Sequence, residues 1–438
     1  MTTPLPRQRW TMITLCFLAC TINYVDRANL AVAAPYLQRE FGLNAAAMGL
    51  VLSGFFWTYA AMQMPWGWFA DRAGPRTSLS IAVGWWSVFT ASTAAAGGFF
   101  SLEASRLLLG VGEAGAYPSF TRVVADWFPR RERSFASSIY DSGSRTGAVL
   151  ALPIVALIIG VWGWRASFII TGALGLIWVG FWLKMYRDPE RHPAVAPPAL
   201  AALQAEIQAE RRWRDGAPAG SAPSWGSLFR YRTIWAMMIG FFCLNFAIFF
   251  FITWFPSYLV QARGFSLTQL GTLGTLPGVL AIPGGWCGGW ASDRLYRRGW
   301  SLNAARKTCL VGGMLLSSVI VLSAFVANIY ICLGLFAVSY ASLAFTGASV
   351  WALPADVAPT RAHVASIGGI QNFAANLAGI VISTFTGFML LLTSGSFVVP
   401  LVAAGIACIV GAAVYLFMLG DIKPLPALNA PKAHATAP

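Results

Sequence analysis

Long apolar segments recur along almost the whole chain, and they restrict the folds that it can adopt. Each runs for about 20 residues before glycine, proline or charged residues interrupt it, which is the length that an α-helix needs to cross a bilayer. Only 11% of the 438 residues are charged and 57% are hydrophobic, whereas a soluble domain has roughly 25% charged residues. The sequence therefore predicts an all-α integral membrane protein.

Twelve such segments can be counted, and they define the predicted architecture. They lie at residues 11–35, 46–70, 77–98, 101–125, 134–160, 165–186, 233–261, 268–291, 308–327, 329–354, 363–392 and 397–420. A polar stretch with one predicted surface helix separates the sixth segment from the seventh. We therefore expect an N-terminal six-helix bundle at 1–186, a cytoplasmic linker at 187–232, and a C-terminal six-helix bundle with a short cytoplasmic tail at 233–438.

The distribution of basic residues sets the predicted orientation. Of the 30 lysines and arginines, 24 fall on loops, tails and helix ends on one side of the predicted membrane, and the other six are Arg27, Arg39, Arg106, Arg145, Arg165 and Arg263. By the positive-inside rule, both termini are expected in the cytoplasm. The net charge of +14 is explained by this asymmetry, so we expect no nucleic-acid partner. Abundant alanine and a low ratio of lysine to arginine favour a bacterial protein, and hence a multi-pass protein of the inner (plasma) membrane.

One motif occurs twice in the chain. Gly67-Trp-Phe-Ala-Asp-Arg ends the second segment, and Gly289-Trp-Ala-Ser-Asp-Arg ends the eighth. Each follows a segment that contains a proline, and each leads into a basic loop. Halves that repeat in the same orientation are typical of parallel repeats about an axis along the membrane normal. The two predicted bundles are therefore expected to be pseudo-symmetric.

These motifs resemble those of a known family. Gly67-x3-Asp71-Arg72-x-Gly74-x-Arg76 is similar to the signature between the second and third helices of the major facilitator superfamily. Within that superfamily, the motifs of the anion:cation symporter family, which includes galactonate and glucarate permeases, resemble Asn23-Tyr24-x-Asp26-Arg27, Phe56-Trp57-x-Tyr59, Arg106-x6-Glu113 and Trp127-Phe128-Pro129-x2-Glu132-Arg133. The resemblance implies a carrier that imports a small organic anion with protons by alternating access.

Several charged residues within the segments are expected to share one level of the membrane. A helix rises 1.5 Å per residue, so Asp26 and Arg27 lie roughly 20–25 Å from the cytoplasmic end of the first segment. The fourth segment starts outside and places Arg106 about 10 Å down, with Glu113 two turns deeper on the same face. Charges in the bilayer interior cost at least a few kcal/mol and usually face a cavity. The sequence therefore predicts a site near the midplane of the first bundle.

Each charged residue of this site has a predicted role. Arg27 and Arg106 are predicted to bind a substrate carboxylate, because a guanidinium is always protonated and matches a carboxylate in shape. Asp26 and Glu113, the only carboxylates deep in the first and fourth segments, are predicted to carry the coupled proton, and the resemblance implies the same roles. The alternative is structural: Asp26 would neutralise Arg27 or Arg106, and Glu113 would hold helices together through a buried ion pair.

The motif Asp141-Ser-Gly-Ser144-Arg145 is a departure from the family pattern, because sugar-acid permeases usually have an uncharged polar or aromatic residue where Arg145 stands. In one interpretation, Arg145 binds a second anionic group of the substrate, as on a diacid. In the other, it only pairs with Asp141, four residues away on the same helix face. Ser144 is a further candidate substrate ligand.

Polar and aromatic residues complete the predicted cavity and its gates. Tyr24 and Tyr59 are expected to bind the substrate from the first bundle, and Trp351, Gln371 and Asn372 from the second. Charged residues at cytoplasmic helix ends are predicted to gate the carrier through ion pairs between the two bundles. These gating residues are Asp71, Arg72, Arg76, Glu132, Arg133, Asp293 and Arg294.

Other function classes find little support in the sequence. It has no recognisable nucleotide-binding loop or Ser/His/Asp order, and its three histidines and seven cysteines are too scattered for a metal site. We therefore expect no enzyme, metal or cofactor, with the proton as coupling ion and an organic anion, protons and the lipid bilayer as partners of a monomer. Two alternatives stay open: a membrane sensor that binds organic acids without transport, and a sodium-coupled or uniport carrier of the same substrates.

Overall fold

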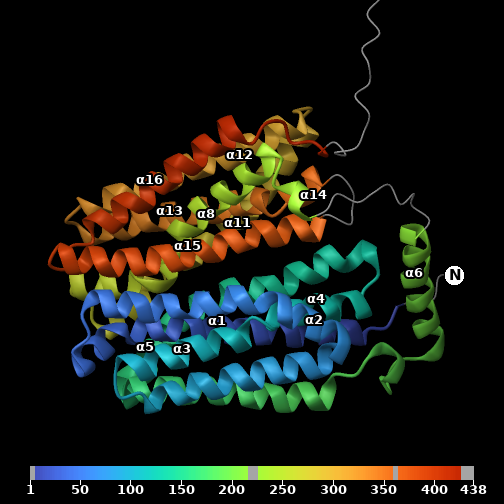
Figure 1. Ribbon diagram of the computed structural model, residues 1–438, viewed down its shortest axis with the longest axis horizontal. Coiled ribbons are helices and arrows are strands. Elements are labelled where there is room, and N and C mark those ends of the chain that lie inside the picture. The colour runs from blue at the N-terminus through green and yellow to red at the C-terminus, as the bar shows by residue number, and fades with distance from the viewer. Residues whose placement is uncertain (1–4, 216–224, 359–363, 426–438) are drawn as a thin grey trace, which may run out of the picture. The chain divides into compact units, whose positions relative to one another are not determined.

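Helices make up every regular element in the part of the chain that the structure, a computed structural model, describes: residues 5–215, 225–358 and 364–425 (Figure 1). The first elements are α1 (Gln8–Phe41), α2 (Ala45–Ser92), η1 (Thr93–Ala95), α3 (Phe99–Glu113), α4 (Ala116–Trp127) and α5 (Arg130–Met185). The predicted linker contains η2 (Pro189–Arg191), α6 (Pro197–Asp215) and α7 (Trp225–Leu228). The remaining elements are α8 (Arg232–Thr253), α9 (Phe255–Ser257), η3 (Tyr258–Ala262), α10 (Leu267–Thr272), η4 (Leu273–Thr275), α11 (Leu276–Arg297), α12 (Leu302–Ser317), η5 (Ser318–Ala324), α13 (Ile329–Val350), α14 (Leu353–Val357), α15 (Val364–Leu392), α16 (Val398–Ala413) and η7 (Val414–Met418).

Single glycines divide the two longest helices. α2 is non-helical at Gly74 (φ 73°, ψ 162°), and α5 is non-helical at Gly163 (φ 83°, ψ 168°). Both φ values lie in the region that glycine alone adopts without a steric penalty. Pro75 follows the first break, where its fixed φ and missing N–H suit the start of a new helical segment. The glycine in the predicted family signature is therefore the residue at which α2 breaks.

Polar side chains mark where neighbouring helices begin and end. α1 ends at Gly42, whose φ of 63° is left-handed. α2 starts after Asn44, whose side-chain oxygen accepts a hydrogen bond from the Ala47 amide at 2.8 Å. Such a cap satisfies a backbone N–H that the helix itself leaves without a partner. The turn between α1 and α2 is thus set by two residues.

Seven helical stretches of the described residues are long and apolar enough to cross a membrane. α2 (with η1) and most of α5 each count as one stretch in spite of their breaks. α1 is not among the seven, although it has 34 residues. Its middle contains Asn23, Asp26, Arg27 and Asn29, and these polar side chains lower its mean hydropathy.

The chain forms two compact units. Unit 1 comprises Met1–Pro218, Phe249–Val279 and Gly379–Pro400, and unit 2 comprises Ala219–Ile248, Leu280–Ala378 and Leu401–Pro438. In unit 1, α1 packs closely on α5: a Cβ added at Gly143 would lie 2.5 Å from the Phe17 carbonyl oxygen, and one added at Gly147 would lie 2.8 Å from Tyr24 Cβ. Small residues spaced four apart allow two membrane helices to approach this closely.

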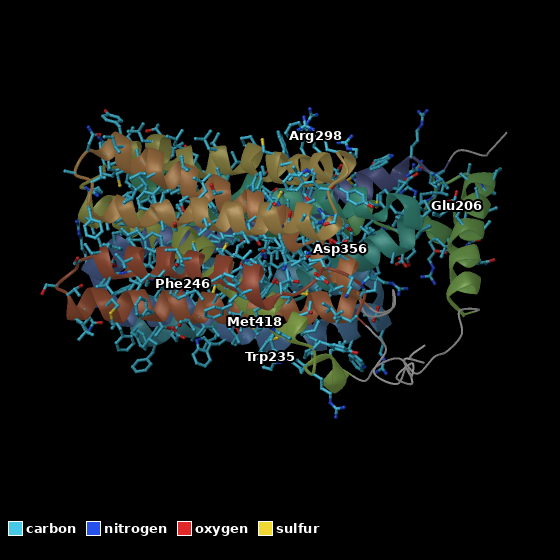
Figure 2. All side chains as sticks on the ribbon, turned by 90° about the horizontal axis from the view of Figure 1, so that it is seen from above. Glu206, Trp235, Phe246, Arg298, Asp356 and Met418 are labelled. Atoms are coloured by element: carbon cyan, nitrogen blue, oxygen red, sulfur yellow. The ribbon has the colours of Figure 1, made fainter. Side chains whose placement is uncertain are left out.

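α6 occupies the part of the linker in which the sequence predicts a surface helix. It runs across the direction of α1 and α2 in Figure 1, and Figure 2 shows Glu206 on it, away from the long helices. Gln204 Nε2 donates to Glu190 Oε1 at 3.4 Å, and Gln8 Nε2 of α1 donates to the Ala194 carbonyl at 2.7 Å. The linker is therefore hydrogen-bonded to the start of the chain.

Candidate functional site

A buried ion pair joins α1 to α3 at the centre of unit 1. Arg27 Nε donates to Glu113 Oε2 at 2.6 Å, and the two side chains are 9% and 0% exposed. Arg106, seven residues before Glu113 on α3, is also buried. The structure therefore brings together three of the four charged residues that the sequence predicts for one site, namely Arg27, Arg106 and Glu113.

Aromatic rings surround the two guanidinium groups. Arg27 Cζ lies 4.8 Å from the ring centre of Tyr24, 4.7 Å from that of Phe55 and 4.7 Å from that of Tyr59. The Phe55 ring also lies 5.3 Å from Arg106 Cζ. A cation is attracted to an aromatic face at these distances. The rings hold both guanidinium groups in place without using their N–H donors.

Several polar atoms of this cluster have no hydrogen-bond partner in the described part of the chain. They are Arg27 Nη2, Arg106 Nε, Glu113 Oε1 and both polar atoms of the Asn23 amide, all of them buried. A buried polar atom without a partner costs about 1–3 kcal/mol, so proteins usually satisfy it. The cluster thus offers guanidinium and amide donors, together with a carboxylate oxygen, to a small polar ligand.

Asp26 faces a different set of neighbours from Arg27. Consecutive helix residues point about 100° apart, so Asp26 faces Thr171 of α5 and Trp86 of α2, with Arg106 and Glu113 also nearby. Both carboxylate oxygens are buried and have no hydrogen-bond partner in the described residues. Part of the predicted structural alternative is therefore present: Glu113 forms a buried ion pair, with Arg27 as its partner. Asp26 does not pair with Arg27, Arg106 lies near it, and its predicted role as a proton carrier stays a prediction.

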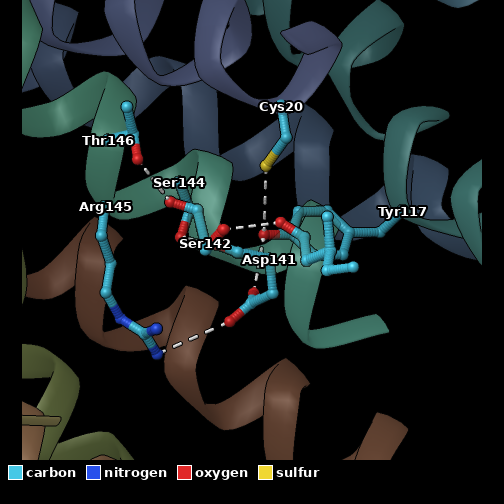
Figure 3. Close-up of polar contacts among 8 residues, drawn as sticks. Cys20, Tyr117, Asp141, Ser142, Ser144, Arg145 and Thr146 are labelled. Carbon is cyan, nitrogen blue, oxygen red and sulfur yellow. Dashed lines mark hydrogen bonds and ion pairs between the residues drawn. The ribbon is translucent and has the colours of Figure 1, made fainter. Parts of the chain in front are cut away.

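A second polar group brings together side chains of α1, α4 and α5 (Figure 3). Tyr117 Oη donates to Asp141 Oδ1 at 3.3 Å and lies 3.8 Å from Cys20 Sγ. Arg145 Nη2 lies 3.6 Å from Asp141 Oδ2, and the two side chains are 44% and 37% exposed. The ion pair of the second interpretation is present, but it is longer than an ordinary hydrogen bond and open to solvent.

Ser144 is turned toward its own helix. Its hydroxyl donates to the Asp141 carbonyl at 2.6 Å, which is the local bond that serines commonly make inside helices. Its oxygen can still accept a hydrogen bond. Its predicted role as a substrate ligand stays a prediction.

The candidates from the predicted second bundle lie in unit 2. Trp351 is 53% exposed, and its ring centre lies 5.3 Å from that of Phe241. Gln371 is buried; its Nε2 donates to the Val350 carbonyl at 3.2 Å, and its Oε1 has no hydrogen-bond partner in the described residues. Asn372 is half-buried, and its carbonyl accepts a hydrogen bond from Asn376 Nδ2 at 3.0 Å. Gln371 therefore keeps one free acceptor.

Two of the predicted gating residues, one in each unit, form an ion pair with an arginine of their own unit. In unit 1, Asp71 lies 3.7 Å from Arg122. In unit 2, Asp293 lies 3.9 Å from Arg306, which also pairs with Asp356 at 3.0 Å. Figure 2 shows Asp356 and Arg298 toward the same end of the unit 2 helices. The repeated motif thus ends in an Asp–Arg pair each time.

The other gating predictions have mixed outcomes. Glu132 pairs with Arg9 at 3.2 Å, again inside unit 1. Arg72 and Arg294 lie over Trp68 and Trp290 at 4.0 and 5.0 Å from the ring centres, and Arg76 donates to the Leu183 carbonyl at 2.8 Å. The Arg133 side chain lies outside the described part. In the described residues, the ion pairs of Asp71, Glu132 and Asp293 therefore join helices of one unit, and a role in gating stays a prediction.

Sequence reasoning missed three residues of the site. Phe55 lies one turn before Tyr59 on α2, so the i, i+4 spacing could have placed it on the same face. Asn23 stands in the motif with Asp26 and Arg27 but was given no role. Glu103 lies one turn before Arg106 on α3, and its half-buried carboxylate is set against the α2 backbone, since a Cβ added at Gly54 would clash with it.

Comparisons with known proteins show which family this chain belongs to by similarity along its length. The family model described as Major Facilitator Superfamily matches residues 16–382. A D-galactonate transporter of Escherichia coli is 34% identical over 426 residues, which cover 95% of this chain and 97% of that protein. The probable galactarate/D-glucarate transporter GudP of Escherichia coli is 36% identical over 427 residues, with coverages of 95% and 94%. The probable sulfoacetate transporter SauU of Cupriavidus necator is 35% identical over 431 residues, with coverages of 98% and 97%.

Solved structures show the same fold. A bacterial homologue of the human lysosomal transporter Spinster, in an inward-facing and occupied conformation, matches with a TM-score of 0.75 at 19% identity, over 94% of this chain and 97% of that one. A D-xylose-proton symporter matches with a TM-score of 0.73 at 15% identity, over 94% and 98% of the two chains. At these identities the likeness concerns the fold alone.

Proposed function

Because this chain belongs to the major facilitator superfamily, we propose that it is a carrier that imports a small organic anion together with protons. The observation that carries the proposal is the buried Arg27–Glu113 pair of 2.6 Å beside Arg106, with donors on both arginines that have no partner among the residues described. Relatives over 30% identical are named as transporters of sugar acids and of sulfoacetate. Two buried guanidinium groups suit the carboxylate that all these compounds have in common.

The proposed carrier crosses the membrane twelve times in two six-helix halves, 1–186 and 233–438, on either side of the linker 187–232. Twelve crossings result when α2 and α5 are divided at Gly74 and Gly163, and when short helices are joined to their neighbours: α3 with α4, α8 with α9 and η3, and α10 and η4 with α11. Both termini would be cytoplasmic in a bacterial inner membrane. The halves would alternate access to one central site.

Proton coupling is proposed to depend on competition for Arg27. Glu113 accepts a hydrogen bond from Arg27 in this structure. An incoming substrate carboxylate would compete for the same guanidinium, and a buried carboxylate that loses its cation binds a proton more readily. Binding of the anion and binding of the proton would then favour each other by the same factor. Asp26, buried near Arg106, is the second proposed proton carrier.

Substitutions of the charged cluster test this function. Arg27→Ala and Arg106→Ala should each abolish substrate binding, and retained affinity would remove the anion site. Glu113→Gln should spare exchange of labelled for unlabelled substrate but stop pH-driven accumulation. Continued uphill uptake by this variant would assign the proton to another residue.

The rival functions differ in their fluxes. In proteoliposomes, a carrier exchanges labelled for unlabelled substrate, whereas a sensor binds it without flux. Uptake should fall with a protonophore and ignore a sodium gradient. Sodium dependence would establish the sodium-coupled alternative, and insensitivity to both would establish a uniporter.

Arg145 bears on which anions are carried. Its guanidinium is half exposed and only loosely paired with Asp141, so donors remain for a second anionic group, as on the diacids galactarate and glucarate. Arg145→Gln should lower the ratio of dianion to monoanion uptake. The second variant, Arg145→Gln with Asp141→Asn, separates the two interpretations: if Arg145 served only to neutralise Asp141, the double substitution would restore the original ratio.

A further inference from the structure

A row of buried hydrogen bonds lies between α1 and the second part of α5. Ser167 Oγ donates to Asn29 Oδ1 at 2.8 Å, and Asn29 Nδ2 donates to Thr171 Oγ1 at 3.1 Å. All three side chains are buried. Gly172 presses the same helix against α2, since an added Cβ would lie 2.6 Å from the Ser87 carbonyl oxygen. The row is therefore shielded from water.

The row ends at Asp26. Thr171 faces the Asp26 carboxylate, and its oxygen already accepts the Asn29 N–H. A hydroxyl has one hydrogen, so the Thr171 hydrogen is not used in the bond from Asn29 and is available to the Asp26 carboxylate, whose oxygens have no partner in the described residues. Trp86 faces the same carboxylate. Its Nε1 can only donate a hydrogen bond, is buried, and has no partner in the described residues. In this arrangement, both neighbours are donors suited to an ionised Asp26.

The other end of the row allows a second arrangement. Ser167 Oγ lies 2.7 Å from the Trp164 carbonyl as well as 2.8 Å from Asn29 Oδ1, and its one hydrogen can serve only one of these acceptors. If the hydrogen points to Trp164, the Asn29 amide can turn over, donate to Ser167 and accept from Thr171. The Thr171 oxygen is then free to accept a hydrogen bond from a protonated Asp26.

We propose that Thr171, Asn29 and Ser167 are positioning residues that follow the protonation of Asp26 by reversing the direction of their hydrogen bonds. The inference rests on the proposed function, because it concerns the proton that Asp26 carries. The row offers a hydrogen-bond donor to the ionised Asp26 and an acceptor to the protonated Asp26, and the change between the two requires little movement of the backbone. Its three side chains take no part in the hydrogen bond of Arg27 with Glu113, so the row is a separate set of hydrogen bonds from the ion pair.

The test measures proton-driven uptake against external pH in proteoliposomes, with counterflow at saturating substrate as the measure of intact binding. Thr171→Val removes the hydroxyl at nearly constant volume. A hydrogen bond to a charged group stabilises it roughly twice as much as a bond between neutral groups. Removing the Thr171 hydroxyl therefore destabilises the ionised form of Asp26 more than the protonated form. The pH of half-maximal uptake should move upward by about one unit. Thr171→Ser keeps the hydroxyl and should restore the original midpoint.

Variants of Asn29 and Ser119 show whether the whole hydrogen-bonded row acts on Asp26 or only the contact with Thr171. Asn29→Leu should move the midpoint in the same direction, and the double variant with Thr171→Val should move it little further, because linked residues are not additive. Ser119→Ala, which deletes another buried hydroxyl of unit 1 bonded to Ser78 at 2.9 Å, should leave the midpoint unchanged. A wild-type midpoint in Thr171→Val, or additive shifts in the double variant, would overturn the inference.

Asp26→Asn distinguishes failure of the inference from failure of the function. If this variant keeps uphill, pH-dependent uptake, Asp26 carries no proton and the proposed coupling is wrong at this residue. If it loses uphill uptake while the Thr171 and Asn29 variants behave as wild type, only the hydrogen-bonded row is wrong. Glu113 and Arg106, which also face Asp26, stay unchanged in all these variants.

Discussion

Gly147→Ala tests whether helix packing positions the arginine of the site. A Cβ added at Gly147 would meet the Thr21 carbonyl oxygen and would lie 2.8 Å from Tyr24 Cβ. Carbon atoms in contact lie about 3.5–4.0 Å apart, so α1 must move away from α5 by about 0.7 Å. Because the Tyr24 ring packs on Arg27 at 4.8 Å, the movement reaches the ion pair.

The expected effect follows from that displacement. The Arg27–Glu113 hydrogen bond of 2.6 Å would lengthen to as much as about 3.3 Å, which is beyond the usual range for charged groups. Overpacking costs about 1–3 kcal/mol, so thermal stability in detergent should fall. A loss of about 1.4 kcal/mol in binding would lower substrate affinity tenfold, measured as the KM of counterflow.

A glycine of the same helix provides the control. A Cβ added at Gly160 would lie 3.7 Å from the Leu267 side chain, an ordinary contact. Gly160→Ala should therefore leave KM unchanged and stability unchanged or slightly higher. If Gly147→Ala matched Gly160→Ala in both measurements, close packing of α1 on α5 would not control the site.

Three further outcomes are expected. Phe55→Leu removes the ring shared by both guanidinium groups and should cost about 1–2 kcal/mol of thermal stability, whereas Phe55→Tyr, which keeps the ring, should not. A Cβ added at Gly387 would lie 2.9 Å from Gly49 Cα, so Gly387→Val should separate α15 from α2 and reduce counterflow, while Gly387→Ala should have a smaller effect. Burial and the nearby Arg187 lower the pKa of His192, so its stabilising contribution is present above the unfolded pKa of about 6.5 and is lost as the pH falls through the folded pKa. When the pH is lowered from about 7 to about 5, the melting temperature should therefore fall less steeply for His192→Gln than for wild type.

The depth of the charged residues could be predicted from the sequence, but not their pairing. The helical rise places Asp26, Arg27 and Arg106 near one level and Glu113 about two turns from Arg106, because depth depends only on the count from a segment end. Pairing depends on how each helix is rotated about its axis, and that is set by packing. α1 is rotated so that Arg27 faces Glu113 while Asp26 faces Thr171.

The residues that contact the predicted aspartates come from distant segments and could not be predicted from the sequence. Thr171 and Trp86 belong to apolar stretches in which a single threonine or tryptophan carries no signal of its own. Arg122 and Arg306, which pair with the aspartates of the repeated motif, come from helices that the repeat does not include. The break at Gly74 was not predicted either, although glycine is the residue that adopts its left-handed φ of 73° without a steric penalty.

The single-residue breaks at Gly74 and Gly163 have a mechanical consequence. With one residue between them, the helical segments on either side of each glycine have no slack, so neither can slide along its axis unless the other follows. Asp71 lies just before the first break and pairs with Arg122 of α4, so a rotation at this corner would pull on a third helix. A rearrangement of unit 1 would therefore carry the helical segments beside each glycine together, and Gly74→Ala, which places a side chain at a left-handed φ of 73°, would strain the first of these corners.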